Sequence, residues 1–275
     1  MLGEPPRSEY DLQFTLFGLP VRIHPWFWLI ALLLGINSQI DDMRIWMLML
    51  VAWVAALFVS ILVHELGHAL PLAYVYGART WIVLYGMGGL ALHQPYYSKR
   101  APGTWGTIGY TIAGPFAGFA LAAVVVVGLL LCRIDVTLSF ISFGNLIHIP
   151  RLNLDPISFA LFFQSLPFQV PGPILFLLAE FIDNILFIST FWGLMNLLPL
   201  YPLDGGHVAR EIFLVLDRRN GIANSLWLSV ITGGVIAVLA LMQWINVHEM
   251  QGFPFISLLF GYFAFQSYQM LTQRY

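Results

Sequence analysis

Two histidines and a glutamate form the pattern H-E-x-x-H at His64 to His68, inside an otherwise apolar segment. On a helix, His64 and His68 stand four residues apart and share one face, and Glu65 lies beside that face. Two imidazoles in this arrangement can bind Zn²⁺, and the carboxylate can accept a proton from a water at the metal. The pattern therefore predicts a catalytic zinc site with His64 and His68 as ligands and Glu65 as the acid/base.

The segment directly upstream, residues 45–63, contains no charged side chain. About twenty apolar residues in a row are long enough to cross a bilayer as a helix. A charged side chain inside the bilayer costs roughly 2.5 to 3.5 kcal/mol on insertion scales, so a carboxylate at Glu65 requires a function. In soluble proteins the same short pattern is often an exposed helix surface, and the apolar surroundings weigh against that interpretation here.

The composition of the whole chain is that of a membrane protein. Of its 275 residues, 59% are hydrophobic and 9% are charged, whereas soluble domains carry about 25% charged residues. The net charge of −2 and the lack of a basic tract give no sign of a nucleic-acid partner. The single cysteine, Cys132, excludes an internal disulfide and a multi-cysteine metal site. We therefore expect a multi-pass integral membrane protein in contact with lipid.

Six apolar stretches predict about six transmembrane helices. They lie at residues 25–36, 45–63 with the motif that follows, 104–131, 173–198, 222–245 and 253–271. Asp42 is the expected N-cap of the second span. In the third span, Gly114 and Gly118 form a G-x-x-x-G pattern, which predicts close approach to the helix that carries the metal ligands.

Residues 82–92 differ from these spans, because two short β-forming runs flank a glycine-rich turn that begins at Gly86. This pattern predicts a membrane-associated β-hairpin between the second and third spans. The predicted fold class is therefore an all-α polytopic membrane protein with one hairpin. We expect a single domain over residues 1–275 with a catalytic core at about 43–217. Residues 1–23 read as an extended lead-in, and residues 132–172 receive no assignment.

Positive charge gives the orientation. With six spans, both termini lie on one side of the membrane, and nine of the twelve Lys and Arg residues fall on that side. Basic residues are enriched on the cytoplasmic side, so both termini are expected in the cytoplasm, most simply at the cell (inner) membrane.

A catalytic zinc usually has a third protein ligand. Pro199 and Pro202 must interrupt the fourth span, and Asp204 follows them as the expected N-cap of a helix to about Asp217. The second and fourth spans run in the same direction, so their C-terminal ends reach a similar depth. We favour Asp204 as the third ligand, and His207 is its rival.

These motifs together resemble the site-2 protease family of intramembrane zinc metallopeptidases. The resemblance is carried by the H-E-L-G-H motif from His64, the glycine-rich hairpin at 86–92, and the segment from Asn196 to the Leu-Asp-Gly motif at Asp204. It implies that His64, His68 and Asp204 bind one zinc ion and that Glu65 is the catalytic acid/base. It also implies that Asn196 holds the substrate or the developing oxyanion.

The resemblance further implies the substrate, a transmembrane protein cleaved in or near its membrane segment, as in regulated intramembrane proteolysis. The chain has no room for a PDZ domain between the second and third spans, and it ends in a span without a CBS domain. It therefore resembles the minimal form of the family.

A helical substrate must unwind before it is cleaved, because its carbonyl groups are engaged in helix hydrogen bonds. The hairpin offers an edge strand for the unwound stretch, with contacts expected at Gly88, Gly89, Leu90 and Leu92. Two alternatives remain. A membrane zinc transporter would spread polar groups across the bilayer, whereas here they cluster at one depth. A non-catalytic protein that only binds membrane helices would not require Glu65.

Overall fold

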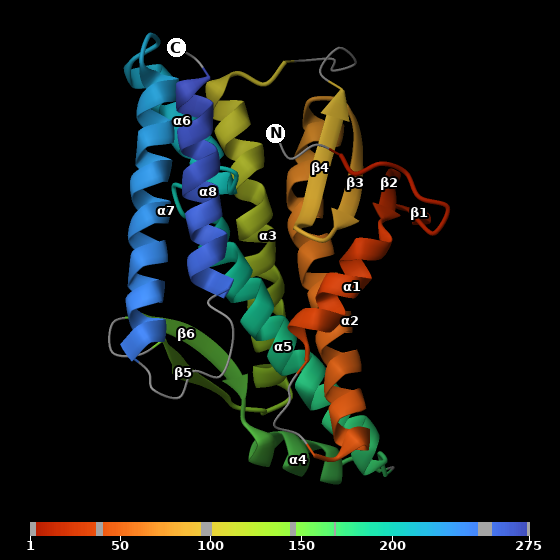
Figure 1. Cartoon of the computed structure of the whole chain (residues 1–275). Coiled ribbons are helices and arrows are strands. Elements are labelled where there is room, and N and C mark those ends of the chain that lie inside the picture. The colour runs from red at the N-terminus through yellow and green to blue at the C-terminus, as the bar shows by residue number, and fades with distance from the viewer. Residues whose placement is uncertain are drawn as a thin grey trace. The chain divides into compact units, whose positions relative to one another are not determined.

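The computed structural model describes residues 4–36, 41–94, 101–143, 147–167, 169–246 and 255–273 (Figure 1). The chain divides into two compact units. The first contains Met1–Ala101, Phe116–Ser139 and Arg151–Gly193, and the second contains Pro102–Pro115, Phe140–Pro150 and Leu194–Tyr275.

Helices make up most of the described chain. They are α1 (Pro25–Leu34), α2 (Met43–Leu70) with a π-helical continuation η1 (Pro71–Val75), α3 (Thr104–Leu131), α4 (Pro156–Gln164), α5 (Gly172–Asn196), α6 (Asp204–Leu216), α7 (Gly221–Asn246) and α8 (Phe255–Thr272). Asp42 caps α2 as predicted, since its Oδ1 accepts hydrogen bonds from the backbone N–H groups of Arg44 and Ile45.

Four of the helices in the described chain are long and apolar enough to cross a membrane: α2 with η1, α3, α5 and α7. The prediction of six spans is thus confirmed only for these four. Helix α1 has ten residues and is therefore about 15 Å long, half the thickness of a bilayer core. Helix α8 matches the predicted segment in position but is not among the four.

The predicted helical membrane architecture with a hairpin is confirmed in part, because the structure is mostly helical but two sheets accompany the helices instead of one hairpin. Strands β1 (Leu12–Leu16), β2 (Leu19–Ile23), β3 (Arg79–Tyr85) and β4 (Gly88–Gln94) form one sheet in the order β1-β2-β3-β4. The predicted hairpin is confirmed as β3–β4. The expected lead-in is instead a hairpin, β1–β2, whose second strand pairs in parallel with β3. In the segment left unassigned, β5 (Val136–Phe143) pairs with β6 (Ile147–Leu154) ahead of α4.

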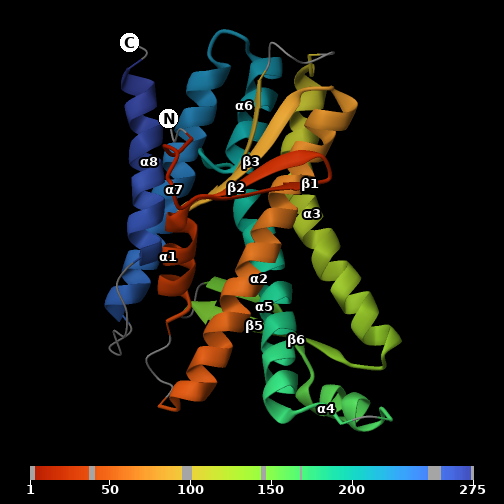
Figure 2. The same cartoon turned by 90° about the vertical axis from the view of Figure 1, so that its right-hand side faces the viewer.

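The core of the first unit lies between one face of the four-stranded sheet and helices α1 and α2 (Figure 2). Alternate residues of the strands, such as Val21, Ile82 and Leu84, point to this face and are buried. They meet small side chains of α2 such as Ala56 and Ala69. The sheet therefore packs against the half of α2 that carries the H-E-x-x-H motif.

Close packing at Gly118 joins α3 to a different helix from the one predicted. A Cβ atom added to Gly118 would lie 3.1 Å from the carbonyl oxygen of Ser189 in α5, so the glycine allows α3 to approach α5 rather than the metal helix. Helix α5 is in turn tied to α2, because the Ser189 hydroxyl donates to the Ser60 hydroxyl at 3.1 Å.

The second unit contains α6, α7 and α8. Helices α7 and α8 run side by side in Figures 1 and 2. Gly233 permits their close approach, since a Cβ there would lie 3.0 Å from the carbonyl oxygen of Phe260. Helix α6 packs along α7, so α7 links the other two helices.

Candidate metal centre

His64 and His68 lie on one face of α2, as the spacing predicted. Their Nε2 atoms are 3.2 Å apart and both residues are buried, with exposed fractions of 3% and 8%. Two nitrogens bound to zinc at about 2.0–2.1 Å in tetrahedral geometry lie about 3.3 Å apart. The observed spacing therefore fits two ligands of one tetrahedral metal ion.

Glu65 is buried, with an exposed fraction of 5%, and its side chain lies directly against Gly89 of β4. A Cβ atom built on Gly89 would overlap the Glu65 side chain and lie 2.5 Å from its Oε1. Burial, together with the negative charge of Glu65, raises the pKa of the nearby Tyr85 phenol in β3. The hairpin therefore forms one wall around the carboxylate.

Asn196 and Asp204 lie at the two ends of a break in the second unit. Asn196 is the last residue of α5 and is buried, and α6 begins at Asp204. The predicted break is therefore confirmed, but Asp204 is the first helical residue and the N-cap is Leu203. A carboxylate in the first turn is favoured by the helix dipole. The helix also ends at Leu216, one residue before the predicted end.

Two glycines allow α6 to begin where it does, a role that the sequence pattern did not indicate. A Cβ on Gly205 would lie 2.4 Å or closer to carbonyl oxygens of Leu197 and Leu198, and one on Gly206 would collide with the backbone of Tyr201. The first turn of α6 therefore packs directly against the backbone of residues 197–201, which connect α5 to α6. A side chain at Gly205 or Gly206 would clash with this backbone.

Buried serines of α7 and α8 hold the same segment. The backbone N–H of Tyr201 donates to Ser229 Oγ at 3.0 Å. The Ser267 hydroxyl donates to the Phe263 carbonyl oxygen at 2.9 Å and lies 3.5 Å from the Tyr201 carbonyl oxygen. Ser229 also donates to the carbonyl oxygen of Ser225, so its hydroxyl proton is engaged and its lone pairs face Tyr201. The sequence offered no signal for these contacts beyond serines within apolar helices.

His64 and His68 lie in the first unit and Asp204 lies in the second, and all three side chains are of metal-ligating type. His24 is buried and caps α1, because its Nδ1 accepts from the Trp26 N–H. His93 lies in β4, and burial lowers the pKa of its imidazole.

The comparison with known proteins identifies the family. Residues 52–241 match the model of peptidase family M50. This chain belongs to peptidase family M50. With the four long apolar helices, membership makes it an integral membrane protein.

Individual relatives agree with this membership. A zinc metalloprotease of Methanocaldococcus jannaschii is 23% identical over 237 residues, which cover 85% of this chain and 54% of that protein. A protein of Synechocystis, provisionally named a zinc metalloprotease, is 28% identical over 207 residues, covering 72% of this chain and 42% of that one. The chain thus spans about half the length of these curated relatives. The fold resembles that of the solved site-2 protease from Methanocaldococcus jannaschii, with a TM-score of 0.50 and 22% identity over 94% of this chain and 95% of the other.

Proposed function

We propose that this M50 member is a zinc-dependent endopeptidase that hydrolyses peptide bonds in or near transmembrane segments of other membrane proteins. The observation that carries the proposal is the pair of imidazole Nε2 atoms, 3.2 Å apart and buried beside Glu65 within an apolar helix. Neutral imidazoles in this geometry fit zinc. Asp204 is the proposed third ligand, since its carboxylate is of metal-ligating type and opens α6 directly after the break in the chain.

Each residue of the proposed site has a separate role in peptide hydrolysis. Zinc at this site supplies a Lewis acid that lowers the pKa of water toward about 7. Glu65 accepts the proton of the attacking water and afterwards donates it to the leaving amine. Asn196 donates an amide N–H to the substrate carbonyl oxygen as negative charge develops there. The half of α2 buried against the sheet keeps Glu65 and the histidines in fixed positions.

The test of this function is cleavage in a defined membrane. The purified chain, reconstituted in liposomes with a model transmembrane substrate, is expected to cleave it, to lose activity when a chelator removes zinc, and to regain it when zinc is restored. If zinc is bound but no membrane helix is cleaved, and zinc instead accumulates inside the vesicles, the chain is a transporter.

Strand β4 is the part of the first unit best suited to bind an unwound substrate. It is the last strand of its sheet. It pairs antiparallel with β3, so that Gly88 lies opposite Tyr85 next to the turn and Gly89 lies opposite Leu84. The pair that flanks a two-residue turn is hydrogen-bonded, and such pairs alternate along the ladder. The backbone groups of Leu90 and Leu92 therefore face β3, whereas those of Gly89, Ala91 and His93 point toward the edge.

This register selects the proline substitution that tests strand addition. Ala91→Pro removes an edge N–H while leaving the β3–β4 ladder intact, and proline is tolerated on edge strands. We expect cleavage to fall about tenfold with zinc content unchanged, since one lost hydrogen bond is worth about 1 kcal/mol and the ring obstructs its neighbours. Ala91→Ser keeps the N–H and should cleave normally. Equal activity of both variants would argue against strand addition at β4.

The cytoplasmic position of the N-terminus stays a proposal that native Cys132 helps to test. Cys132 follows α3 and is exposed, so the proposed topology leaves it outside the cell. An impermeant thiol reagent should label wild type in intact cells and should not label Glu9→Cys in a Cys132→Ser background until the cells are broken. The reverse pattern would invert the topology.

A further inference from the structure

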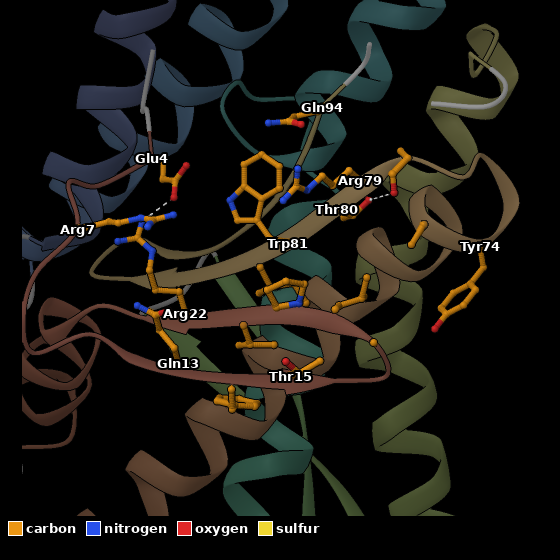
Figure 3. A pocket seen from close by; sticks show the side chains of 18 residues that line it. Glu4, Arg7, Gln13, Thr15, Arg22, Tyr74, Arg79, Thr80, Trp81 and Gln94 are labelled. Carbon is orange, nitrogen blue, oxygen red and sulfur yellow. Dashed lines mark hydrogen bonds and ion pairs between the residues drawn. The ribbon is translucent and has the colours of Figure 1, made fainter. Parts of the chain in front are cut away.

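A cavity of about 770 Å³ lies on the outer face of the four-stranded sheet, opposite the face that packs against α2 (Figure 3). Its walls come from three parts of the first unit. The N-terminal segment provides Glu4 and Arg7, the strands provide residues such as Arg79 and Trp81, and η1, which continues α2, provides Tyr74. Neither Glu65 nor either motif histidine lines the cavity, so it is separate from the proposed catalytic site.

The position of the cavity along the chain places it at a membrane surface. Tyr74 belongs to the last turn of the first long apolar helix, which ends at Val75, and Arg79 follows within four residues. The Tyr74 hydroxyl donates a hydrogen bond to the Phe17 carbonyl oxygen. The two side chains are 69% and 63% exposed, respectively. Exposed aromatic residues where an apolar helix ends are typical of the headgroup region.

The side chains around the cavity carry a net positive charge. The Arg22 guanidinium contacts two carboxylates, Glu4 and Asp11, each at 2.8 Å, so these three side chains carry a net charge of −1. With Arg7 and Arg79 the net charge around the cavity is +1. Arg7 and Arg79 form no ion pair within the described part of the chain. In Figure 3 the side chain of Trp81 stands between these two arginines. Two guanidinium groups beside an indole ring match an anion attached to an amphipathic molecule.

One polar atom of the cavity wall also lacks a partner. Gln94 Oε1 is buried and accepts no hydrogen bond within the described chain, and Gln94 lines the cavity. A buried acceptor without a donor is costly, so a hydroxyl group of a ligand at this place would be stabilising.

We propose that this cavity binds the headgroup of an anionic phospholipid. Arg7 and Arg79 contact the phosphate, Gln94 accepts from a headgroup hydroxyl, and the exposed aromatic residues near Tyr74 lie along the upper part of an acyl chain. Since Trp81 and Arg79 belong to β3, the bound lipid would hold the sheet, and with it the edge strand β4, at a fixed depth.

Native mass spectrometry of the purified full chain tests the proposal. The protein is transferred from nanodiscs of phosphatidylcholine with added phosphatidylglycerol, and retained phosphatidylglycerol is counted. Arg7→Gln combined with Arg79→Gln should weaken retention about thirtyfold, because each arginine near an anionic surface contributes about 1 kcal/mol. The matched control is Arg218→Gln with Arg219→Gln, which removes the same charge from exposed positions in the turn before α7. The control should retain the lipid as wild type does.

Further measurements can contradict the proposal. If the double variant proves unstable, Arg79→Lys replaces it, because lysine keeps the positive charge. This variant should show a loss of phosphatidylglycerol retention between those of wild type and the double variant. Short-chain phosphatidylglycerol should bind wild type, and this binding should weaken with salt, while inorganic phosphate binds more weakly because it lacks the apolar part. Equal retention by the double variant and its control, or displacement by an acidic peptide and not by the short-chain lipid, would overturn the proposal.

A second inference comes from the serines of the second unit and rests on the proposed role of Asp204. Tyr201 N–H donates to Ser229, and the first turn of α6 rests on the Tyr201 backbone at Gly206. We infer that Ser229 is a positioning residue for Asp204. It acts through Tyr201, and it links the position of α7 to that of the proposed ligand.

The rate of zinc loss to a chelator measures this role apart from catalysis. Ser229→Ala leaves a buried N–H without its acceptor, and zinc should leave about tenfold faster than from wild type. Ser257→Ala is the matched control, since Ser257 also ties α8 to α7, through the Ala237 carbonyl oxygen, but lies away from Tyr201. Ser229→Thr should restore the wild-type rate. Equal rates for the two alanine variants would contradict the role of Ser229, whereas unchanged zinc binding in Asp204→Ala would instead contradict the ligand assignment.

Discussion

Glu65→Gln is expected to lower cleavage of a transmembrane substrate at least about a hundredfold while the chain keeps its zinc. Glutamine preserves the size and hydrogen-bonding capacity of the side chain but cannot accept the proton of the attacking water. General acid/base groups contribute typically 10²–10⁴-fold to rate, which sets the expected loss. The histidines remain in place, so about one zinc per chain should be retained.

Metal content by elemental analysis, measured beside cleavage in liposomes, separates the two roles. His64→Ala is the comparison variant, because it removes a ligand and should lower zinc content and activity together. A Glu65→Gln protein that cleaves at nearly the wild-type rate would show that another group is the base. Loss of zinc from Glu65→Gln would mean that the carboxylate supports the metal site instead.

Features that depend on neighbouring residues were predictable from the sequence. The N-cap at Asp42 and the β3–β4 turn are local structures, and each is specified by a few side chains in a row. The proximity of His64 to His68 is equally local, since it follows from one turn of helix. These elements were predicted correctly because no distant contact is needed to form them.

Features that depend on distant partners were not predictable in the same way. Strand β2 pairs in parallel with β3, for example at Val21↔Ile82, and nothing in the short run of β2 identifies a partner so far along the chain. Gly118 suggested close helix packing correctly but could not say that the neighbour is Ser189. The strand at Val136–Phe143 was a missed signal, because its alternation of apolar and hydroxyl side chains is present in the sequence.

The candidate site shows the same division. Residue types and spacing nominated the histidines, the glutamate and the aspartate, whose chemistry is intrinsic to their side chains. The supporting residues carry no such chemistry. Gly205, Gly206 and Ser229 matter only through what they touch, so their roles became visible once the backbone of Tyr201 was located.

Gly89→Ala is expected to reduce cleavage about as severely as a change to Glu65 itself. The added methyl group would overlap the Glu65 side chain, and both groups are confined, one by a paired strand and the other by a buried helix. The carboxylate must therefore move, and a displacement of about 1 Å at a reacting group can cost about a hundredfold in rate. The three atoms nearest to the new methyl group all belong to Glu65, so zinc content should change little.

A double-mutant cycle identifies the cause of that loss. If Gly89 acts through Glu65, adding Gly89→Ala to Glu65→Gln should lower the residual activity by less than about threefold, because the displaced base is already absent. Gly128→Ala is the control for a glycine-to-alanine change, since a Cβ there meets nothing within 4 Å and alanine stabilises a helix. Full additivity of the two losses, or a Gly89→Ala protein with normal activity, would show that the close contact between β4 and Glu65 does not govern catalysis.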